Sequence, residues 1–352
     1  MSKLGVSLVC QDITELGGWV EAIEEAGFDA IGFGDSPALY PETYVQAAIV
    51  AEHSRRALFG PRVTNPVTRH PSVTASAMSA VHRLGGGRAV LGIGLGDSAV
   101  HTVGVPRATV AELEAYVRAL RELFQTGETT YRGSLMRCPY ARRPVPVYIS
   151  ASGPRGLGLA GEIADGVIIG TGLRPELVDR ALGHVEAGAR RAGRSLADLD
   201  IWWLMGASIG PSRAQAAEAI KTHLAAAANA CFRGAWQGKG VPPELEPALR
   251  ALVDNYDFAN HEIPAGESRN VSGALADPAL AEYLAQRFAV AGTAAQFAQQ
   301  VRQAAAWGAD QLWLTMPLPD KYGFLSQVRD DVQPLLRGPA AGPQAPATQG
   351  AL

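Results

Sequence analysis

The sequence has 352 residues, of which 47% are hydrophobic and 18% are charged. This composition is typical of a globular protein with a substantial core, and it excludes the disordered and fibrous classes of protein. Lysine and arginine total 31 against 34 aspartate and glutamate residues, so the net charge is −3 and provides no basic field for nucleic acid. We therefore expect no nucleic-acid partner.

The cysteines and the first residues of the chain indicate its location. Cys10, Cys138 and Cys231 are odd in number, far apart and outside any CxxC or Cys/His spacing, which indicates reduced thiols and no zinc site. The opening stretch MSKLGVSLVCQDI contains an apolar run that is too short for a signal peptide or a membrane span. These features predict a cytoplasmic protein with no membrane partner and no bound metal.

Short apolar runs alternate with amphipathic stretches of helical period along the chain. Eight runs are predicted strands: residues 4–9, 29–34, 57–64, 88–95, 147–150, 166–169, 200–206 and 311–315. The stretches between them, from ITELGGWVEAIEEAG to AAQFAQQVRQAAAWG, are predicted helices. Repeated strand–helix units in this number indicate an α/β fold of the (β/α)8 TIM barrel type, because a doubly wound open sheet normally has about five to seven strands.

A bare barrel needs about 250 residues, and the surplus of this chain lies in two places. Residues 232–284 follow the seventh predicted strand and are rich in Pro, Gly and Asn, so we expect a long insertion at the active-site face. Residues 337–352 form a Pro/Ala/Gly-rich segment of low complexity, which predicts a flexible tail. We predict a single barrel domain, residues 1–336, that includes the insertion.

Polar and small residues follow four of the predicted strands. In a parallel barrel the carboxyl ends of the strands form one face, where catalytic and binding residues collect. The second predicted strand ends in Asp35 and Ser36, and the third leads into RVTNPVTRHPS, which contains His70. The fourth ends in LGIGLGDSAV, and the fifth ends in the turn ISASGPRG. We therefore predict a polar site at this face.

The turn after the fifth predicted strand has two interpretations. Ser150, Ser152, Gly153 and Gly156 surround the first turn of a predicted helix, where unpaired N–H groups and the positive end of the helix dipole favour a phosphate group. Small side chains there would allow the phosphate to approach. In the alternative, Ser152 only caps the helix and the glycines are packing positions. The sequence leaves both interpretations open.

The glycines of LGIGLGDSAV do not form a dinucleotide-binding motif, because the third glycine is misplaced and no helix opens directly after them. Bare backbone beside a flat ligand fits them better, and tight packing between strands is the alternative. Packing alone leaves Asp97 unexplained. His70 stands before a proline where a helix begins, so it is either a helix cap or a residue with a direct ligand or proton-transfer role.

Several motifs, taken in order, resemble those of the luciferase-like flavin and deazaflavin oxidoreductases. They are IEEAGFDAIGFGDS, GPRVTNPVTRHPSVTASAMSAVHRL, GRAVLGIGLGDSAV and SGPRGLGLAGEIADGVIIG. The resemblance covers nearly the whole chain up to the last predicted strand, and it is to the branch that contains methylenetetrahydromethanopterin reductase. It implies a luciferase-like TIM barrel with FMN, or its deazaflavin relative, at the strand ends.

The resemblance also implies roles for particular residues. Asp35 and Ser36 would lie near the ring of the cofactor. The residues in contact with the face or edge of the ring would be Arg62, Val63, Thr64, Asn65, Leu95, Gly96 and Asp97. The residues around the phosphate would be Ser150, Ala151, Ser152, Gly153 and Gly156. Many members of the family have a cis peptide bond in the third strand, which here would join Arg62 and Val63.

The chain departs from these relatives at three positions. The methanopterin enzyme has a glycine where this chain has Arg62, and the deazaflavin-dependent sugar-phosphate dehydrogenases have a histidine and a glutamate where it has Ser36 and Asp97. Ser36 cannot act as a base at neutral pH without help, whereas Asp97 can move a proton. The predicted catalytic residues are Asp97, His70 and Ser36.

Two enzymatic functions follow from the resemblance. In the first, which we favour because the family so often works with FMN, a separate flavin reductase supplies reduced FMN and the barrel supports oxygenation of a small organic substrate while it excludes water. In the second, a reduced deazaflavin coenzyme exchanges hydride with an alkene, imine or carbonyl substrate. A flavin-binding structural protein is the non-enzymatic alternative. The sequence leaves open whether the protein forms a homodimer.

Overall fold

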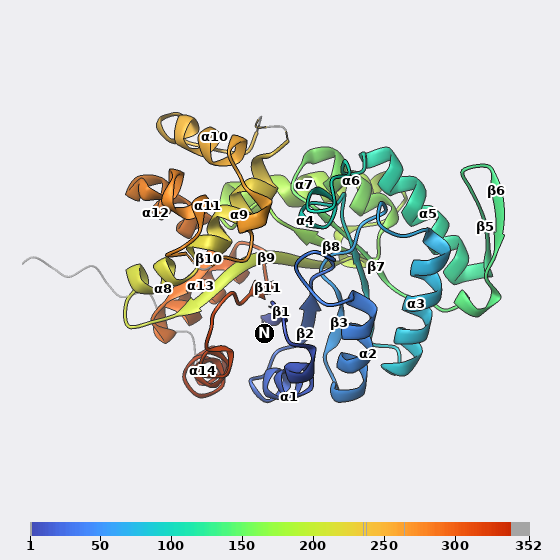
Figure 1. The fold of residues 1–352 in the computed structure, drawn as a ribbon, viewed down its shortest axis with the longest axis horizontal. Helices are drawn as coiled ribbons and strands as arrows, with labels where there is room; N and C mark the ends of the chain where they lie inside the picture. Colours follow the sequence, from blue (N-terminus) through green and yellow to red (C-terminus); the bar gives the residue numbers. More distant parts are fainter. Residues whose placement is uncertain (1, 235, 237, 264, 339–352) are drawn as a thin grey trace, which may run out of the picture.

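The computed structural model describes residues 2–234, 236, 238–263 and 265–338 of a parallel (β/α)8 barrel (Figure 1). The barrel strands are β1 (Lys3–Leu8), β2 (Ala30–Phe33), β3 (Leu58–Pro61), β4 (Leu91–Ile93), β7 (Val147–Ala151), β8 (Gly166–Ile169), β9 (Asp200–Ile209) and β11 (Gln311–Thr315). They pair in the order β3-β2-β1-β11-β9-β8-β7-β4. Isolated bridges, Phe59↔Ala89 and Thr64↔Ile93, join β3 to β4 and bring the barrel nearly to closure. The predicted barrel is confirmed, and every predicted strand overlaps one of these strands.

Three short strands were not predicted. β10 (Ala289–Gly292) pairs in parallel with residues 206–209 of β9 and lies off the path of the barrel strands. β5 (Glu128–Tyr131) and β6 (Ser134–Arg137) form a separate antiparallel hairpin at the edge of the molecule (Figure 1). The two residues of its turn, Arg132 and Gly133, both have positive φ, which suits a tight hairpin turn.

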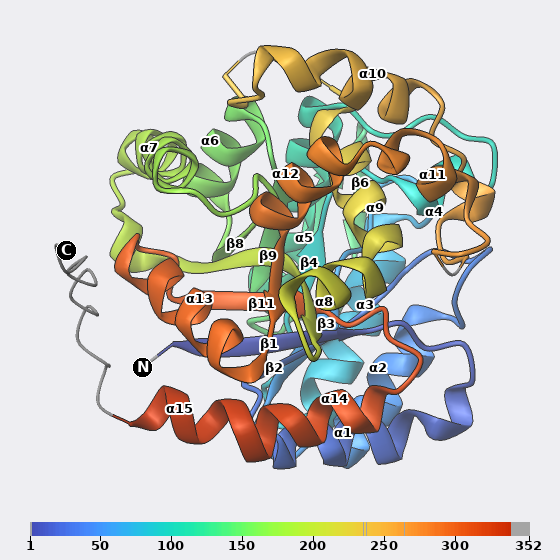
Figure 2. The same ribbon diagram turned by 90° about the vertical axis from the view of Figure 1, so that its left-hand side faces the viewer.

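Helices cover the outside of the barrel (Figures 1 and 2). They are α1 (Leu16–Glu25), α2 (Thr43–His53), α3 (Pro71–Leu84), α4 (Ser98–His101), α5 (Val110–Thr126), α6 (Pro154–Ile163), α7 (Pro175–Arg191), α13 (Ala294–Ala306), α14 (Lys321–Gln327) and α15 (Gln333–Arg337). Side-chain caps define several of their starts, as where Thr109 and Glu112 form a capping box at α5. Among the described residues, no helix has the length and apolar character needed to cross a membrane.

The inside of the barrel is filled with side chains. Trp202 of β9 and Trp313 of β11 pack with ring centroids 5.2 Å apart, and both are almost fully buried. Val90, Tyr148 and Ile168 belong to the same cluster. Because this interior is packed and apolar, groups that react or bind must lie at an end of the barrel.

The segment between β9 and β10 forms a helical insertion with its own hydrophobic core. Its helices are α8 (Arg213–Ala219), α9 (Lys221–Phe232), α10 (Glu246–Asp254), α11 (Arg269–Ser272) and α12 (Pro278–Phe288), and Figures 1 and 2 show them gathered on one side of the barrel. Leu224, Phe232, Leu249, Leu280 and Phe288 are buried in this second core. The insertion thus starts before the predicted residues 232–284. Residues 339–352 of the predicted tail lie outside the described residues.

Helices α6 and α7 cross with their backbones in contact, and glycines make this approach possible. A Cβ added at Gly188 would lie 1.9 Å from the carbonyl oxygen of Gly158, and one at Gly161 would lie 2.0 Å from that of Val185. Real Cβ atoms cannot approach backbone so closely, so these positions require glycine. By contrast, a Cβ at Gly153 would meet no atom within 4 Å. Gly161 inside α6 is thus a packing position, whereas the space beside Gly153 at the start of the helix is open.

The carboxylate of Glu24, at the end of α1, organises the loop that leads into β3. It accepts hydrogen bonds from Ser54 Oγ at 2.7 Å and from the N–H groups of Arg55, Arg56 and Ala57 at 2.9–3.1 Å. Burial raises the pKa of Glu24, but these hydrogen bonds together outweigh it and hold the pKa below its usual 4.5.

We expect this carboxylate to contribute to the acid sensitivity of the fold. A carboxyl group whose pKa is lower in the folded state stabilises that state above its unfolded pKa, and the stabilisation is lost as the pH falls through the folded pKa. Glu24→Gln should therefore flatten the fall in the urea midpoint between about pH 5 and pH 3. Glu52→Gln, exposed on α2, is the control and should follow the wild type. Identical pH profiles for both variants would contradict this role of Glu24.

Candidate active site

β3 ends in a cis peptide bond between Arg62 and Val63. Pairing with β4 resumes after it, because the N–H of Thr64 donates to Gly92 O and the N–H of Gly94 donates to Thr64 O, both at 2.9 Å. A Cβ at Gly92 would lie 2.3 Å from the carbonyl oxygen of Pro61, so glycine is required beside this bulge. The cis bond implied by the resemblance is confirmed.

The turn after β4 presents bare backbone between two neighbouring strand ends. A Cβ at Gly94 would lie 3.2 Å from Val63 Cγ2 and 3.7 Å from Ser150 Cβ, so the turn lies between the bulge of β3 and the end of β7. Gly96 has φ +93°, a conformation that favours glycine. Asp97 follows at the start of α4. The structure thus brings together the predicted residues of the third, fourth and fifth predicted strands.

Asn65 combines a structural role with an unpaired donor. Its Oδ1 accepts hydrogen bonds at 2.9 Å from the N–H groups of Val67 and Thr68, as in an Asx turn. Its Nδ2 is buried and has no hydrogen-bond partner in the described part of the chain. A buried unpaired donor costs free energy, and a ligand oxygen that accepts from it would remove that cost. This fits the carbonyl oxygens of a flavin or deazaflavin ring.

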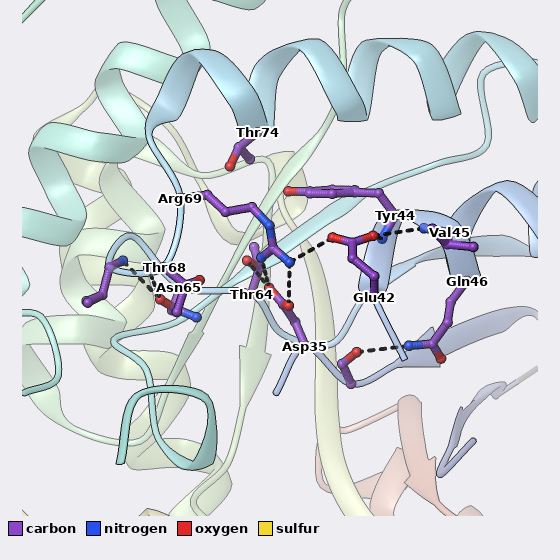
Figure 3. A network of polar contacts seen from close by, with 12 residues as sticks. Asp35, Glu42, Tyr44, Val45, Gln46, Thr64, Asn65, Thr68, Arg69 and Thr74 are labelled. Carbon is purple, nitrogen blue, oxygen red and sulfur yellow. Dashed lines mark hydrogen bonds and ion pairs between the residues drawn. The ribbon is translucent and has the colours of Figure 1, made fainter. Parts of the chain in front are cut away.

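Asp35 is the centre of a buried polar network (Figure 3). Its Oδ2 accepts hydrogen bonds from Thr64 Oγ1 and Arg69 Nη1, each at 2.6 Å, and its Oδ1 accepts from Arg69 Nη2 at 3.0 Å. Arg69 also pairs with Glu42 at 2.8 Å and lies over the ring of Tyr44. Asp35 therefore ties the loop after β2 to the loop after β3. Sequence reasoning missed this function, because nothing local links Asp35 to Arg69.

Ser36 and Asp97 both have partners at the barrel mouth. The hydroxyl groups of Ser36 and Ser98 are hydrogen-bonded at 2.7 Å. Asp97 Oδ1 pairs with Arg233 Nη1 at 2.9 Å, and the guanidinium of Arg233 lies over the ring of Phe258 at 4.2 Å. Arg233 follows the last residue of α9, so this ion pair joins the insertion to the turn after β4. No local pattern in the sequence indicated it.

His70 caps α3. Its Nδ1 accepts a hydrogen bond from the N–H of Ser72 at 3.4 Å, bonds Ser72 Oγ at 2.8 Å, and its exposed ring packs edge-on against Tyr131. The structure does not join His70 to Ser36 or Asp97 by a hydrogen bond. The capping alternative is therefore confirmed, and a proton-transfer role for His70 stays a prediction.

α6 begins without a side-chain cap, because its N-cap residue is Gly153. Pro154 has no N–H group, and the N–H groups of the following first-turn residues have no partner within the helix. At Gly156, a Cβ would meet Ala151 Cβ at 3.0 Å, whereas the space around Gly153 is open. The alternative interpretation required Ser152 to cap the helix, but the N-cap residue is Gly153 and no side chain caps it. An uncapped helix start with open space beside it fits a phosphate group.

A second group of polar side chains lies at the mouth on the side of β11. Arg62 Nη2 donates to Thr315 Oγ1 at 2.7 Å, and burial lowers the pKa of Arg62 to about 9, so it is charged at neutral pH. Burial, with a smaller effect of Arg62, lowers the pKa of His223 to about 3, so its ring is neutral. Tyr40 OH donates to the carboxylate of Glu262 in the insertion. Sequence reasoning missed Thr315, His223 and Glu262.

In the described part of the chain, neither a metal centre nor the other polar groove offers a comparable site. Among the described residues, no group of three or more His, Cys, Asp or Glu side chains is placed to hold a metal ion. An open polar groove is lined by Arg121, Asp165 and Arg194, with an ion pair between Arg121 and Asp165 at 2.7 Å. Asp165 directly precedes β8, so this groove lies at the amino ends of the strands, opposite the face where barrel enzymes carry out their chemistry.

A nearly closed parallel barrel with a cis bulge at the end of β3, a glycine turn after β4 and an uncapped helix after β7 defines the class of a luciferase-like oxidoreductase. The chain belongs to the luciferase-like monooxygenase family, whose model matches residues 2–311. The resemblance inferred from the motifs is confirmed.

Curated relatives of the chain include a reductase and a dehydrogenase. It is 27% identical over 331 residues to 5,10-methylenetetrahydromethanopterin reductase of Archaeoglobus fulgidus, covering 92% of this chain and 96% of that protein. It is 28% identical over 344 residues to F420-dependent glucose-6-phosphate dehydrogenase of Nakamurella multipartita, covering 92% of this chain and 93% of that protein. The second relative is F420-dependent, so it supports the deazaflavin alternative better than the FMN-dependent monooxygenase that we expected first.

Solved structures show the same fold. The coenzyme F420-dependent tetrahydromethanopterin reductase of Methanopyrus kandleri matches with a TM-score of 0.73 at 22% identity, covering 96% of this chain and 99% of that chain. A monooxygenase from Streptomyces bottropensis matches with a TM-score of 0.66 at 16% identity, covering 94% of this chain and 99% of that chain. The preference for FMN is not confirmed; it depended on how common FMN is in the family and not on any residue of this chain.

Proposed function

We propose that this protein is an F420-dependent oxidoreductase, which transfers hydride between the deazaflavin and a small organic substrate with an alkene, imine or carbonyl group. The main support is that an F420-dependent dehydrogenase matches the chain over 92% of its length. Further support comes from unpaired groups at the mouth that suit a tricyclic ring with a phosphate tail, namely Asn65 Nδ2 and the start of α6.

The bulge of β3 and the turn after β4 would hold the ring. Val63 and the backbone of residues 94–97 would contact it, and the Nδ2 of Asn65 would donate a hydrogen bond to one of its oxygens. Thr64 is held in place by Asp35, so the network of Figure 3 would keep this surface rigid. When bound, the deazaflavin supplies two-electron hydride chemistry.

The first turn of α6 would hold the phosphate. Its free N–H groups point along the helix dipole toward an anion, Ser150 and Ser152 can donate hydrogen bonds, and Arg155 adds a positive charge. Gly153 and Gly156 leave the backbone accessible. The sequence already predicted a phosphate at Ser150, Ser152, Gly153 and Gly156, and this assignment adds Arg155 to them.

Asp97 is the proposed proton-transfer residue. A substrate alcohol or amine that gives up hydride to form a carbonyl or imine must also lose a proton, and the Asp97 carboxylate, paired with Arg233, can accept it. The Asp97 side chain is 35% exposed at the glycine turn, and its ion pair with Arg233 fixes its orientation. Ser36 and His70 are weaker candidates, because the first is paired with Ser98 and the second is a helix cap.

The second candidate function is an FMN-dependent monooxygenase served by a separate flavin reductase. The family description and the fold shared with a solved monooxygenase support it. That structure is only 16% identical, so it supports the fold and not the chemistry.

Binding of the two coenzymes tests the proposal. We expect the wild type to bind oxidised F420 at least tenfold more tightly than FMN in a fluorescence titration. Ser152→Asp should weaken F420 binding tenfold or more, because it places an anion beside the phosphate at the start of α6. Ser134→Asp, exposed on the β5–β6 hairpin, is the matched control and should bind as the wild type does. Tighter binding of FMN would favour the second candidate, and unchanged affinity in Ser152→Asp would contradict the phosphate assignment.

A further inference from the structure

Arg62 is a charged side chain without a carboxylate partner among the described residues. Its Nη2 donates to Thr315 Oγ1, whereas its Nε is enclosed by protein atoms and has no hydrogen-bond partner among the described residues. Tyr40 lies near it, but burial raises the pKa of that phenol, so Tyr40 is uncharged at neutral pH, and no carboxylate of the described chain pairs with Arg62. Arg62 is partly buried, and a partly buried cation without an anion beside it is less favourable than a paired one. Its position at the mouth therefore points to an anionic ligand.

Two more unpaired polar atoms lie around Arg62. Ser7, at the end of β1, is 4% exposed and its Oγ has no partner in the described chain. A Cβ added at Gly32 would lie 2.8 Å from this Oγ and 2.9 Å from Arg62 Cβ, so the serine and the arginine are neighbours. His223 of α9 also has an unpaired Nε2, and it is close enough to Arg62 for the charge to act on its pKa. Hydrogen-bonding groups from β1, β3 and the insertion thus converge on one place.

Glu262, the carboxylate near Arg62, has other hydrogen-bond partners. Glu262 accepts the hydrogen bond of Tyr40 and lies 3.7 Å from His261 Nε2, and Tyr256 OH is hydrogen-bonded to His261 Nδ1 at 2.7 Å. His223 is neutral, because burial lowers its pKa to about 3. Tyr40 is uncharged and does not cancel the charge of Glu262, but Glu262 does not pair with Arg62, so the positive charge of Arg62 has no direct carboxylate partner among the described residues. A monoanion such as a carboxylate matches that charge, whereas a phosphate dianion would leave a negative charge away from water.

This place is distinct from the proposed phosphate site of the coenzyme. In the circular strand order, β1 and β7 are opposite each other. Ser7 lies on β1, and Thr315 lies on β11 beside it, whereas α6 follows β7. A ring held at the bulge of β3 and the turn after β4 would extend its tail toward α6. Arg62 would then lie beside the ring on the side away from α6. A ligand at Arg62 is therefore a second molecule.

We infer that Arg62, assisted by Ser7, Thr315 and His223, binds a carboxylate group of the substrate, so the substrates of this enzyme are small organic acids. The carboxylate would accept hydrogen bonds from the guanidinium and from the Ser7 hydroxyl, while Thr315 orients the guanidinium through Nη2. The inference rests on the proposed function only for the redox step, because the carboxylate site depends on Arg62 and its neighbours and not on the coenzyme. Arg62 is thus a specificity residue, whereas the family resemblance placed it at the face of the cofactor ring.

Ligand-observed NMR titration with benzoate tests the inference, with methyl benzoate as the uncharged probe and inorganic phosphate as the dianion. We expect saturable binding of benzoate to the wild type, at least tenfold weaker binding of both other probes, and a tenfold or larger loss of benzoate affinity in Arg62→Leu. Thr315→Val and Ser7→Ala should each weaken benzoate binding several-fold. These two variants keep Arg62 and decide the question if Arg62→Leu does not fold.

The outcomes separate this inference from the proposed function. F420 binding is measured on the same variants by fluorescence, and we expect Ser7→Ala and Thr315→Val to change it less than threefold. Benzoate binding without F420 binding would contradict the proposed function and leave the carboxylate site standing. No saturable benzoate binding by the wild type, tighter binding of phosphate, or wild-type benzoate affinity in Arg62→Leu or in both other variants would overturn the carboxylate site.

Discussion

Asp35→Asn is expected to lower the free energy of unfolding by about 3 kcal/mol. The substitution removes the charge that faces Arg69 at 2.6 Å in a site where the Asp35 side chain is 3% exposed. Losing one partner of a buried ion pair costs about 3–5 kcal/mol, and the lower end applies because Glu42 still pairs with Arg69. Urea unfolding of the variant and the wild type measures this difference.

An exposed ion pair provides the control for Asp35. Glu186 and Arg190 pair at 2.6 Å on the surface of α7, and Glu186→Gln should cost less than about 1 kcal/mol because water screens the charges. Equal losses in the two variants would contradict the importance of burial. If Asp35→Asn instead keeps its stability and loses F420 affinity, Asp35 acts on the ring directly, as the family resemblance implied.

Gly188→Ala is expected to lower the free energy of unfolding by about 2–3 kcal/mol. The new methyl group would lie 1.9 Å from the carbonyl oxygen of Gly158, so α6 and α7 must move apart. This backbone contact also positions the start of α6, so we expect weaker F420 binding in the same variant. Chemical denaturation and the fluorescence titration measure the two effects.

Gly183→Ala in the same helix is the matched control. Gly183 is exposed, and a Cβ there would meet no atom within 4 Å. The alanine should stabilise the protein by about 0.5–1 kcal/mol, because glycine is unfavourable inside a helix. A stability loss of similar size in both variants would show that helix propensity, and not the contact with α6, decides the effect.

The barrel could be predicted because its strands are local signals. Parallel strands covered by helices are buried on both faces and appear as short apolar runs, which is how all the barrel strands were found. β10 and the β5–β6 hairpin were missed for a related reason. β10 directly follows α12 without a turn signal. The hairpin strands are only partly buried, because exposed and buried residues alternate in β5 and no residue of β6 is buried.

The candidate site divides in the same way. The polar mouth, the turn at Gly96 and the phosphate interpretation at Gly153 came from residues that stand next to the predicted strand ends. The partners of Asp35 and Asp97 did not, because Arg69 is 34 residues and Arg233 136 residues away in sequence. Only the family resemblance indicated the cis bond, since no residue pattern requires one there.

The sequence by itself determined the number of barrel strands, the face that carries the site and the family of the protein, because each depends on short-range hydrophobic patterning or on motifs read in order. Only the tertiary structure decided which charges are neutralised. It pairs Asp35 with Arg69 and Asp97 with Arg233, and in the described part of the chain it leaves Arg62 without a carboxylate partner. The physical reason is that electrostatic interactions depend on distance and burial in space, and loops from separate strands set both.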